Sequence, residues 1–236
     1  MTILSKDFLN KRFEKKVFTG LPLTILVLLF LILLATFIGM TDSIVNSYPI
    51  VKIDNSFAHY LYTIRNPLTA KILYAITSLA NQITIVVFFI AFAIYLYFKK
   101  EIAYLYSLVF IFFGTDASIF LIKLFINRTR PGADIAYYIE KSKSFPSGHS
   151  AIAMAIFGFF TYYIINHLDK KMNKSLVVSL GVSLIILVGF SRLYLGVHYL
   201  SDVLGGLLLG GLWLIAGMTF REEHFYVESL KKGKTE

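Results

Sequence analysis

The chain has 236 residues, of which 57% are hydrophobic and only 16% charged. Soluble domains carry about 25% charged residues, so this composition excludes an ordinary soluble domain and a disordered chain and predicts an integral membrane protein. The absence of cysteine excludes disulfides, thiolate metal sites and cysteine nucleophiles, while the net charge of +9 calls for an explanation by membrane topology or by nucleic-acid binding.

The first predicted membrane span is the uncharged segment 21–40, which is long enough to cross a hydrocarbon core of about 30 Å. A basic run precedes it, as it would in a secretory signal, but a signal has a shorter apolar region and a small-residue cleavage site. We therefore expect a retained first helix. The basic residues are Lys6, Lys11, Arg12, Lys15 and Lys16.

The second uncharged run, 72–98, is too long for one simple crossing and contains Asn81 and Gln82. We place the crossing at 83–98 and expect the preceding residues to be helical, with an amphipathic interfacial helix at 57–71. Further spans are predicted at 102–122, 147–167, 176–190 and 199–220. The predicted fold is all-α: a six-span transmembrane helical bundle with an interfacial helix and short loops, forming a single membrane domain over residues 1–236.

The basic residues predict the orientation of this bundle. Six spans place both termini, the 2–3 loop and the 4–5 loop on one side, and that side holds 14 of the 23 Lys and Arg residues. The excess predicts cytoplasmic termini. Topology thus accounts for the net charge, and no nucleic-acid partner is expected.

Three polar stretches fall on the opposite face by the parity of the spans. Lys123 and Arg130-Pro131 follow the third span, Pro146-Ser147-Gly148-His149 opens the fourth, and the link before the sixth carries Ser191-Arg192, His198 and Asp202. Arginine can fork two donors onto a phosphate, and Ser147-Gly148 at a helix N-terminus offers free backbone N–H groups.

The histidines in these stretches can supply the reacting groups. His198 and Asp202 are four residues apart and share a helix face, so the carboxylate can fix the imidazole tautomer and leave the other ring nitrogen free as a nucleophile. His149 could protonate a leaving oxygen. Three cations and backbone N–H groups could neutralise a phosphoryl group without a metal or cofactor. Singly, each feature also has a structural reading, such as a snorkelling lysine or a helix cap.

Together, the motifs K-x6-R-P, P-S-G-H and S-R-x5-H-x3-D make the sequence resemble the type-2 phosphatidic acid phosphatase superfamily of integral membrane lipid phosphatases. The resemblance covers roughly residues 72–218, with the signature region at 123–202, and none of the three motifs departs from the family pattern. It implies that His198 is the nucleophile of a phosphohistidine mechanism, oriented by Asp202. It also implies that His149 is the acid and then the base, and that the phosphate is held by Lys123, Arg130, Ser147, Gly148 and Arg192. Vanadium haloperoxidases have a similar site but are soluble.

The expected function is hydrolysis of a lipid phosphate or diphosphate at the outer face of the plasma membrane. Short tails and a bare six-helix core favour a bacterial enzyme. Undecaprenyl diphosphate is the first choice of substrate, followed by phosphatidylglycerophosphate or phosphatidate. A lipid or anion transporter is the competing class, but it would more often show repeats and broken helices. The oligomeric state is left open.

Four further features are interpreted less sharply. Asp116 is costly in a bilayer and is either an interhelical hydrogen-bonding group or a support for the site. Residues 133–145 could touch headgroups, and surface solvation explains them equally well. Gly206 and Gly210 predict close helix packing. The Asn127-Arg128-Thr129 glycosylation pattern is discounted because it lies inside the first motif.

Overall fold

The computed structural model describes residues 18–46, 49–169 and 173–232, and within these ranges the regular structure is entirely helical. The basic run at 6–16, together with Lys170, Lys171 and Lys234, lies outside the described residues. The helices, in chain order, are α2 (Leu21–Val45), α3 (Ile50–Thr63), α4 (Pro67–Ser78), α5 (Gln82–Phe98), α6 (Ile102–Ile126), α7 (Gly148–Ile152), the π-helical segment η1 (Ala153–Phe157), α8 (Gly158–His167), α9 (Lys174–Tyr194) and α10 (Leu200–Lys232).

Six helical segments of the described chain are long and apolar enough to cross a membrane, which confirms the predicted fold class. The second span combines α4 and α5, and α5 matches the crossing expected at 83–98. The single interfacial helix predicted at 57–71 is wrong: the chain breaks at residues 64–66. Asn66 caps the new helix by accepting hydrogen bonds from the backbone of Leu68 and Thr69.

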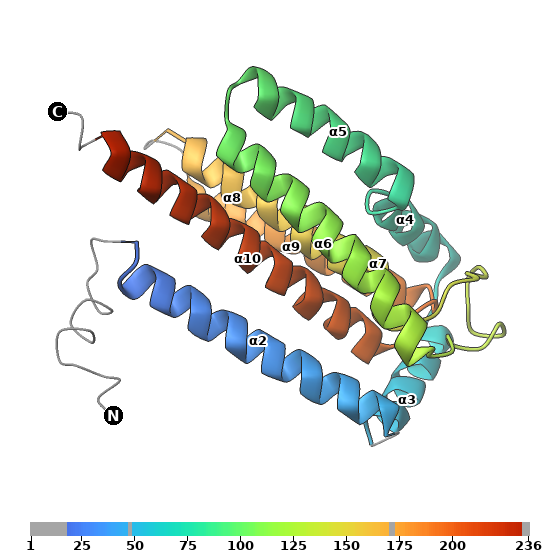
Figure 1. Cartoon of the computed structure of the whole chain (residues 1–236). Helices are drawn as coiled ribbons and strands as arrows, with labels where there is room; N and C mark the ends of the chain where they lie inside the picture. Colours follow the sequence, from blue (N-terminus) through green and yellow to red (C-terminus); the bar gives the residue numbers. More distant parts are fainter. Residues whose placement is uncertain (1–17, 47–48, 170–172, 233–236) are drawn as a thin grey trace, which may run out of the picture.

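Helix α10 is the centre of the bundle and packs against α2, α6 and α7 (Figure 1). The predicted close packing at Gly206 and Gly210 is confirmed, because a Cβ at these positions would overlap backbone oxygens of Ser147 and Ala151. This approach brings the start of α7 against the first turns of α10, so the second and third motifs meet.

The outer surface of the bundle is apolar. Ile32 is 62% exposed and Phe125 is 83% exposed, as expected where the surrounding solvent is lipid. Aromatic side chains fill much of the interior between α5, α6 and α8, where Phe89 stacks on Phe112 and Phe92 packs against Phe160.

The polar motifs gather at one end of the bundle. Helix α2 begins and α10 ends at the opposite end, whereas the long loop between α6 and α7 emerges beside α3 and the start of α10 (Figure 1). Two left-handed residues shape this end. Asn127 (φ 51°) stops α6 and turns the chain into the loop, and Gly196 (φ 66°) turns the link between α9 and α10.

Candidate active site

A cavity of about 450 Å³ lies at this end of the bundle, between α5, α6, α7 and the loop. One part of its lining is charged or polar and the other is apolar, so its shape and chemistry suit an amphipathic ligand. The polar part consists of Lys123, Arg130, Glu140, Ser142, His149 and His198, with Gln82 and Asp116; the apolar part includes Ala80, Ile85, Val86, Phe112, Ile119 and Ile152.

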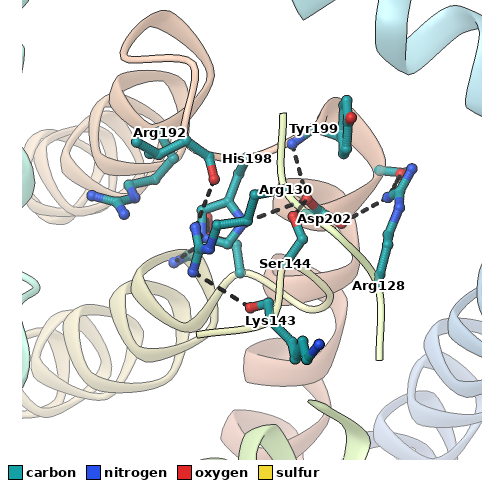
Figure 2. A network of polar contacts seen from close by, with 12 residues as sticks. Arg128, Arg130, Lys143, Ser144, Arg192, His198, Tyr199 and Asp202 are labelled. Carbon is teal, nitrogen blue, oxygen red and sulfur yellow. Dashed lines mark hydrogen bonds and ion pairs between the residues drawn. The ribbon is translucent and has the colours of Figure 1, made fainter. Parts of the chain in front are cut away.

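His198 and Asp202 form the predicted pair. His198 lies in the link just before α10, and its Nδ1 is 3.4 Å from Oδ2 of Asp202 in the first turn of that helix. The same oxygen accepts a 2.9 Å hydrogen bond from the backbone N–H of Tyr199 and another from the Ser144 hydroxyl. Asp202 therefore caps its own helix while it holds the imidazole (Figure 2).

The contacts of His198 determine which ring nitrogen carries the proton. Nη1 of Arg130 lies 3.0 Å from Nε2 of His198, and because a guanidinium can only donate, Nε2 must accept. The proton of the neutral ring then sits on Nδ1, facing Asp202. Burial, aided by the positive charges of Arg130 and Arg192, holds the pKa of His198 well below its ordinary value of 6.5. At neutral pH the ring is uncharged and Nε2 carries the lone pair.

Arg130 is held in a fixed position by the loop and by the link before α10. Its guanidinium donates to the carbonyl of Ser142 at 2.7 Å and to the carbonyl of Val197 at 2.6 Å. It also forms a 2.7 Å ion pair with Glu140. This places a permanent cation on the unprotonated nitrogen of His198, which accepts a hydrogen bond from it (Figure 2).

Glu140 joins two of the cations that were predicted to hold phosphate. Besides its bond to Arg130, its carboxylate pairs with Arg192, which is fully buried and also contacts Tyr138. Burial by itself would raise the pKa of Glu140, but the charges of Arg192 and Arg130 outweigh it and hold that pKa at about 2. Within the described chain, Nε of Arg192 is buried and has no hydrogen-bond partner, so this cation has donor capacity to spare.

Some of the other predicted site residues line the cavity and some do not. Lys123, Gly148 and His149 line the cavity. Ser147 does not: its buried hydroxyl accepts from the backbone N–H of Ser150 and caps α7. Arg192 also lies behind the cavity wall, where it reaches the site through Glu140.

Three charged residues of this end were missed by sequence reasoning. Glu140 lies in the loop whose contacts were left open. Asp54 in α3 is buried, and Arg128 was considered only as part of a glycosylation pattern. Arg128 bridges two buried carboxylates, with Nη2 at 2.6 Å from Asp54 and Nη1 at 2.7 Å from Asp202. Burial would lower the pKa of Arg128, but the carboxylates of Asp202 and Asp54 raise it above its usual value.

Asp116, for which the sequence left two roles open, lines the cavity from α6, the helix that also carries Lys123.

Comparison with known proteins gives relatives for the part of the chain that carries the motifs. Phosphatidylglycerophosphatase B of Bacillus subtilis (strain 168) is 40% identical over 124 residues, which are 50% of this chain and 60% of that protein. Lipid phosphate phosphatase delta of Arabidopsis thaliana is 29% identical over 75 residues, 29% of this chain and 18% of that protein. The chain thus matches about 60% of the length of the first relative and less of the second.

Two solved structures are similar to most of the bundle. The transmembrane PAP2-type phosphatidylglycerolphosphate phosphatase of Bacillus subtilis has a TM-score of 0.75 and 28% identity, covering 82% of this chain and 96% of that one. LpxE of Aquifex aeolicus, at 22% identity and a TM-score of 0.54, covers 70% of this chain and 94% of its own and shares the fold. The model of the PAP2 superfamily matches residues 102–226, which contain all three motifs. The chain belongs to the PAP2 superfamily of membrane proteins.

Proposed function

We propose that this membrane protein is a lipid phosphate phosphatase in which His198 is the nucleophile. The single observation that carries the proposal is the state of that ring: Arg130 donates to Nε2, so the proton lies on Nδ1 toward Asp202, and both His198 and Arg130 line the cavity. When an incoming phosphate draws the Arg130 guanidinium to its own oxygens, the lone pair of this neutral imidazole is released and suits attack on the phosphorus of a lipid.

In the proposed first step, Nε2 of His198 forms a bond to phosphorus while the bond from phosphorus to the leaving oxygen breaks. His149, which lines the same cavity, donates a proton to that oxygen. Asp202 stabilises the positive charge that forms on the ring. The products of this step are the lipid alcohol, or a lipid monophosphate from a diphosphate, and a phosphohistidine.

In the second step a water molecule attacks the phosphohistidine. His149, now unprotonated, takes a proton from the water, the bond between nitrogen and phosphorus breaks, and inorganic phosphate leaves. Lys123, Arg130 and Arg192 neutralise the phosphoryl oxygens in both steps, and the backbone N–H of Gly148, which lines the cavity, adds a donor. The backbone N–H of Ser147 already donates to the carbonyl of Asp202. Because Glu140 pairs with Arg130 and Arg192, the incoming phosphate must take over those two partners from it.

For the substrate, the similarity to a curated sequence and to a solved structure of a phosphatidylglycerophosphate phosphatase favours phosphatidylglycerophosphate. Undecaprenyl diphosphate, the first choice from the sequence, is kept as the second candidate for a specific reason. Among the described residues, Lys123 forms no ion pair, and its Nζ contacts only the Ser142 hydroxyl at 3.4 Å, so a further cation is available for a second phosphate.

We also propose that the single membrane domain works with its cavity at the outer face of the plasma membrane. The support for this orientation is the excess of basic residues on the side of the termini.

The test is phosphate release by the purified full-length protein from lipids in mixed micelles, with phosphatidylglycerophosphate, phosphatidate, undecaprenyl diphosphate and a soluble aryl phosphate as substrates. Wild type should release phosphate from a lipid, in EDTA as well as without it, and His198→Ala should abolish release. His59→Ala, which changes an exposed histidine of α3, is the matched control and should retain activity. Wild-type turnover by His198→Ala would overturn the mechanism, and failure to act on any lipid would overturn the function.

A further inference from the structure

We propose that Arg128, held in place by Asp54, is a positioning residue that orients the Asp202–His198 pair for reaction. The proposal rests on the function proposed above for His198. Arg128 lies between Lys123 and Arg130, the fixed positions of the first motif. Asp54 lies in α3, a helix that carries none of the three motifs.

The first observation is that the two oxygens of Asp202 have separate partners. Oδ2 receives the Ser144 hydroxyl and the backbone N–H of Tyr199 and faces His198, whereas Oδ1 receives Nη1 of Arg128 at 2.7 Å. Without Arg128 the carboxylate would be anchored on one side only. The arginine therefore fixes the rotation of the carboxylate and with it the direction in which Oδ2 meets the imidazole (Figure 2).

The second observation is that the guanidinium of Arg128 is held in one orientation by contacts of its own. Its other terminal nitrogen, Nη2, donates to Asp54 at 2.6 Å, and its guanidinium stacks over the Tyr199 ring at 4.6 Å. Nη1 also donates to the Ser201 hydroxyl at 2.7 Å. A guanidinium bridges two carboxylates with two nitrogens held in one rigid plane, whereas an ammonium is a point charge on a flexible stem and does not fix their directions in this way.

Asp54 completes the arrangement from α3. Only 1% of this residue is exposed, and its carboxylate accepts from the backbone N–H of Ser201 at 2.9 Å and from the Ser201 hydroxyl at 2.5 Å. It thereby holds Arg128 and the first turn of α10 together. A buried carboxylate on an otherwise amphipathic surface helix is costly unless it is paired, and here its partners all lie around the nucleophile.

The position of Arg128 separates its role from that of the phosphate-binding cations. Arg130 and Lys123 line the cavity, but the described residues that line it do not include Arg128 or Asp54. Arg128 lies on the far side of Asp202 from His198 and reaches the reaction only through that carboxylate (Figure 2). Its loss should therefore reduce the chemical step and leave substrate binding unchanged.

The experiment compares Arg128→Lys, Asp54→Asn and the double variant with wild type, using the full-length protein and the best lipid substrate. Arg221→Lys is the matched control: Arg221 also pairs with a carboxylate, that of Glu222, and stacks on an aromatic ring, that of Tyr104, but it lies in the second half of α10, about twenty residues after Asp202. Each protein is checked for folding by thermal unfolding followed through Trp213, the only tryptophan.

Arg128→Lys should lower kcat about ten- to a hundredfold, the range expected for losing one hydrogen bond between charged groups, with KM changed less than threefold. Asp54→Asn should lower kcat in the same direction. Because the two residues act as a unit, the double variant should be no worse than about threefold below the poorer single variant. Arg221→Lys should keep wild-type kcat.

Several results would overturn the inference. One is a kcat for Arg128→Lys within threefold of wild type, another is a change confined to KM, and a third is an equal loss in Arg221→Lys. If Arg128→Lys does not fold, Asp54→Asn decides by the same criteria, since it keeps the arginine. These results differ from those that would overturn the proposed function. That function fails if the wild-type protein releases no phosphate from a lipid or if His198→Ala retains turnover.

Discussion

Replacing Asp202 by asparagine tests the electrostatic part of the mechanism, because the structure determines how the amide can sit. If the amide nitrogen faced His198, it would meet three donors, from Ser144, Tyr199 and His198. If the amide nitrogen instead takes the place of Oδ1, it meets the one donor that the described residues offer that oxygen, Nη1 of Arg128 at 2.7 Å. The carbonyl should therefore keep facing His198, and the tautomer of the imidazole should survive the change.

What Asp202→Asn removes is the negative charge that stabilises the cationic ring. At a separation of about 4 Å and an effective dielectric constant near 20, two unit charges interact by about 4 kcal/mol. Since about 1.4 kcal/mol corresponds to a tenfold change, kcat should fall about a thousandfold. KM should stay near the wild-type value, because Asp202 is fully buried and does not line the cavity.

The assay is steady-state phosphate release from the best lipid substrate in mixed micelles, with thermal unfolding measured on the same preparation. Arg128 loses one of its two carboxylate partners, so some loss of stability is expected, and the comparison is made well below the unfolding midpoint. Asp134→Asn, in an exposed part of the loop, is the control and should behave as wild type. A folded Asp202→Asn protein with less than a tenfold loss in kcat would refute the reasoning.

Three further predictions follow from the cavity and the topology. Glu140→Gln should lower the inhibition constant of vanadate, because the carboxylate no longer competes for Arg130 and Arg192; an unchanged or higher constant would show that no displacement occurs. His149→Ala should reduce hydrolysis of phosphatidate more than that of a polyprenyl diphosphate, measured in one preparation, because an alkoxide needs the proton more than a phosphate leaving group; equal losses would remove that argument. A cysteine at exposed Lys141 should react with an impermeant thiol reagent in intact cells while one at Lys99 is protected, and the reverse pattern would invert the topology. Lys141 is preferred to Ser142, whose hydroxyl and carbonyl contact Arg130.

The fold was predictable from the sequence because membrane spans depend on local composition. Apolar runs with at most one charge predicted all six spans, and Lys99-Lys100 correctly separated α5 from α6. The helix boundaries were less predictable. The break at residues 64–66 depends on the cap made by Asn66 and on Tyr194, whose hydroxyl accepts from the backbone of Asn66, a contact between residues 128 positions apart.

The candidate site was predictable to the extent that its residues lie in fixed motifs. The structure brings Lys123, Arg130, His149 and His198 to one cavity as expected. The Ser147 side chain caps α7, a role that the sequence does not distinguish from anion binding, and its part in holding phosphate stays a prediction.

The residues missed at the site share one property: their roles come from long-range pairing. Asp54 and Arg128 are 74 positions apart, and Glu140 is 52 positions from Arg192. One signal was present in the sequence, namely a charge within a segment predicted to lie at or in the membrane, where an unpaired carboxylate is costly. That signal was applied to Asp116 but did not reach Asp54, which lies between the span predicted at 21–40 and the helix predicted at 57–71.

The most direct test of the central claim is to trap the covalent intermediate. The wild-type protein is mixed with a lipid substrate carrying a labelled phosphate, quenched with alkali within milliseconds, and digested for mass spectrometry. We predict a labelled phosphoryl group on His198 that is stable to alkali, lost in acid, and absent from His198→Ala. Turnover of substrate without label on His198, or label on another residue that persists in His198→Ala, would contradict the account.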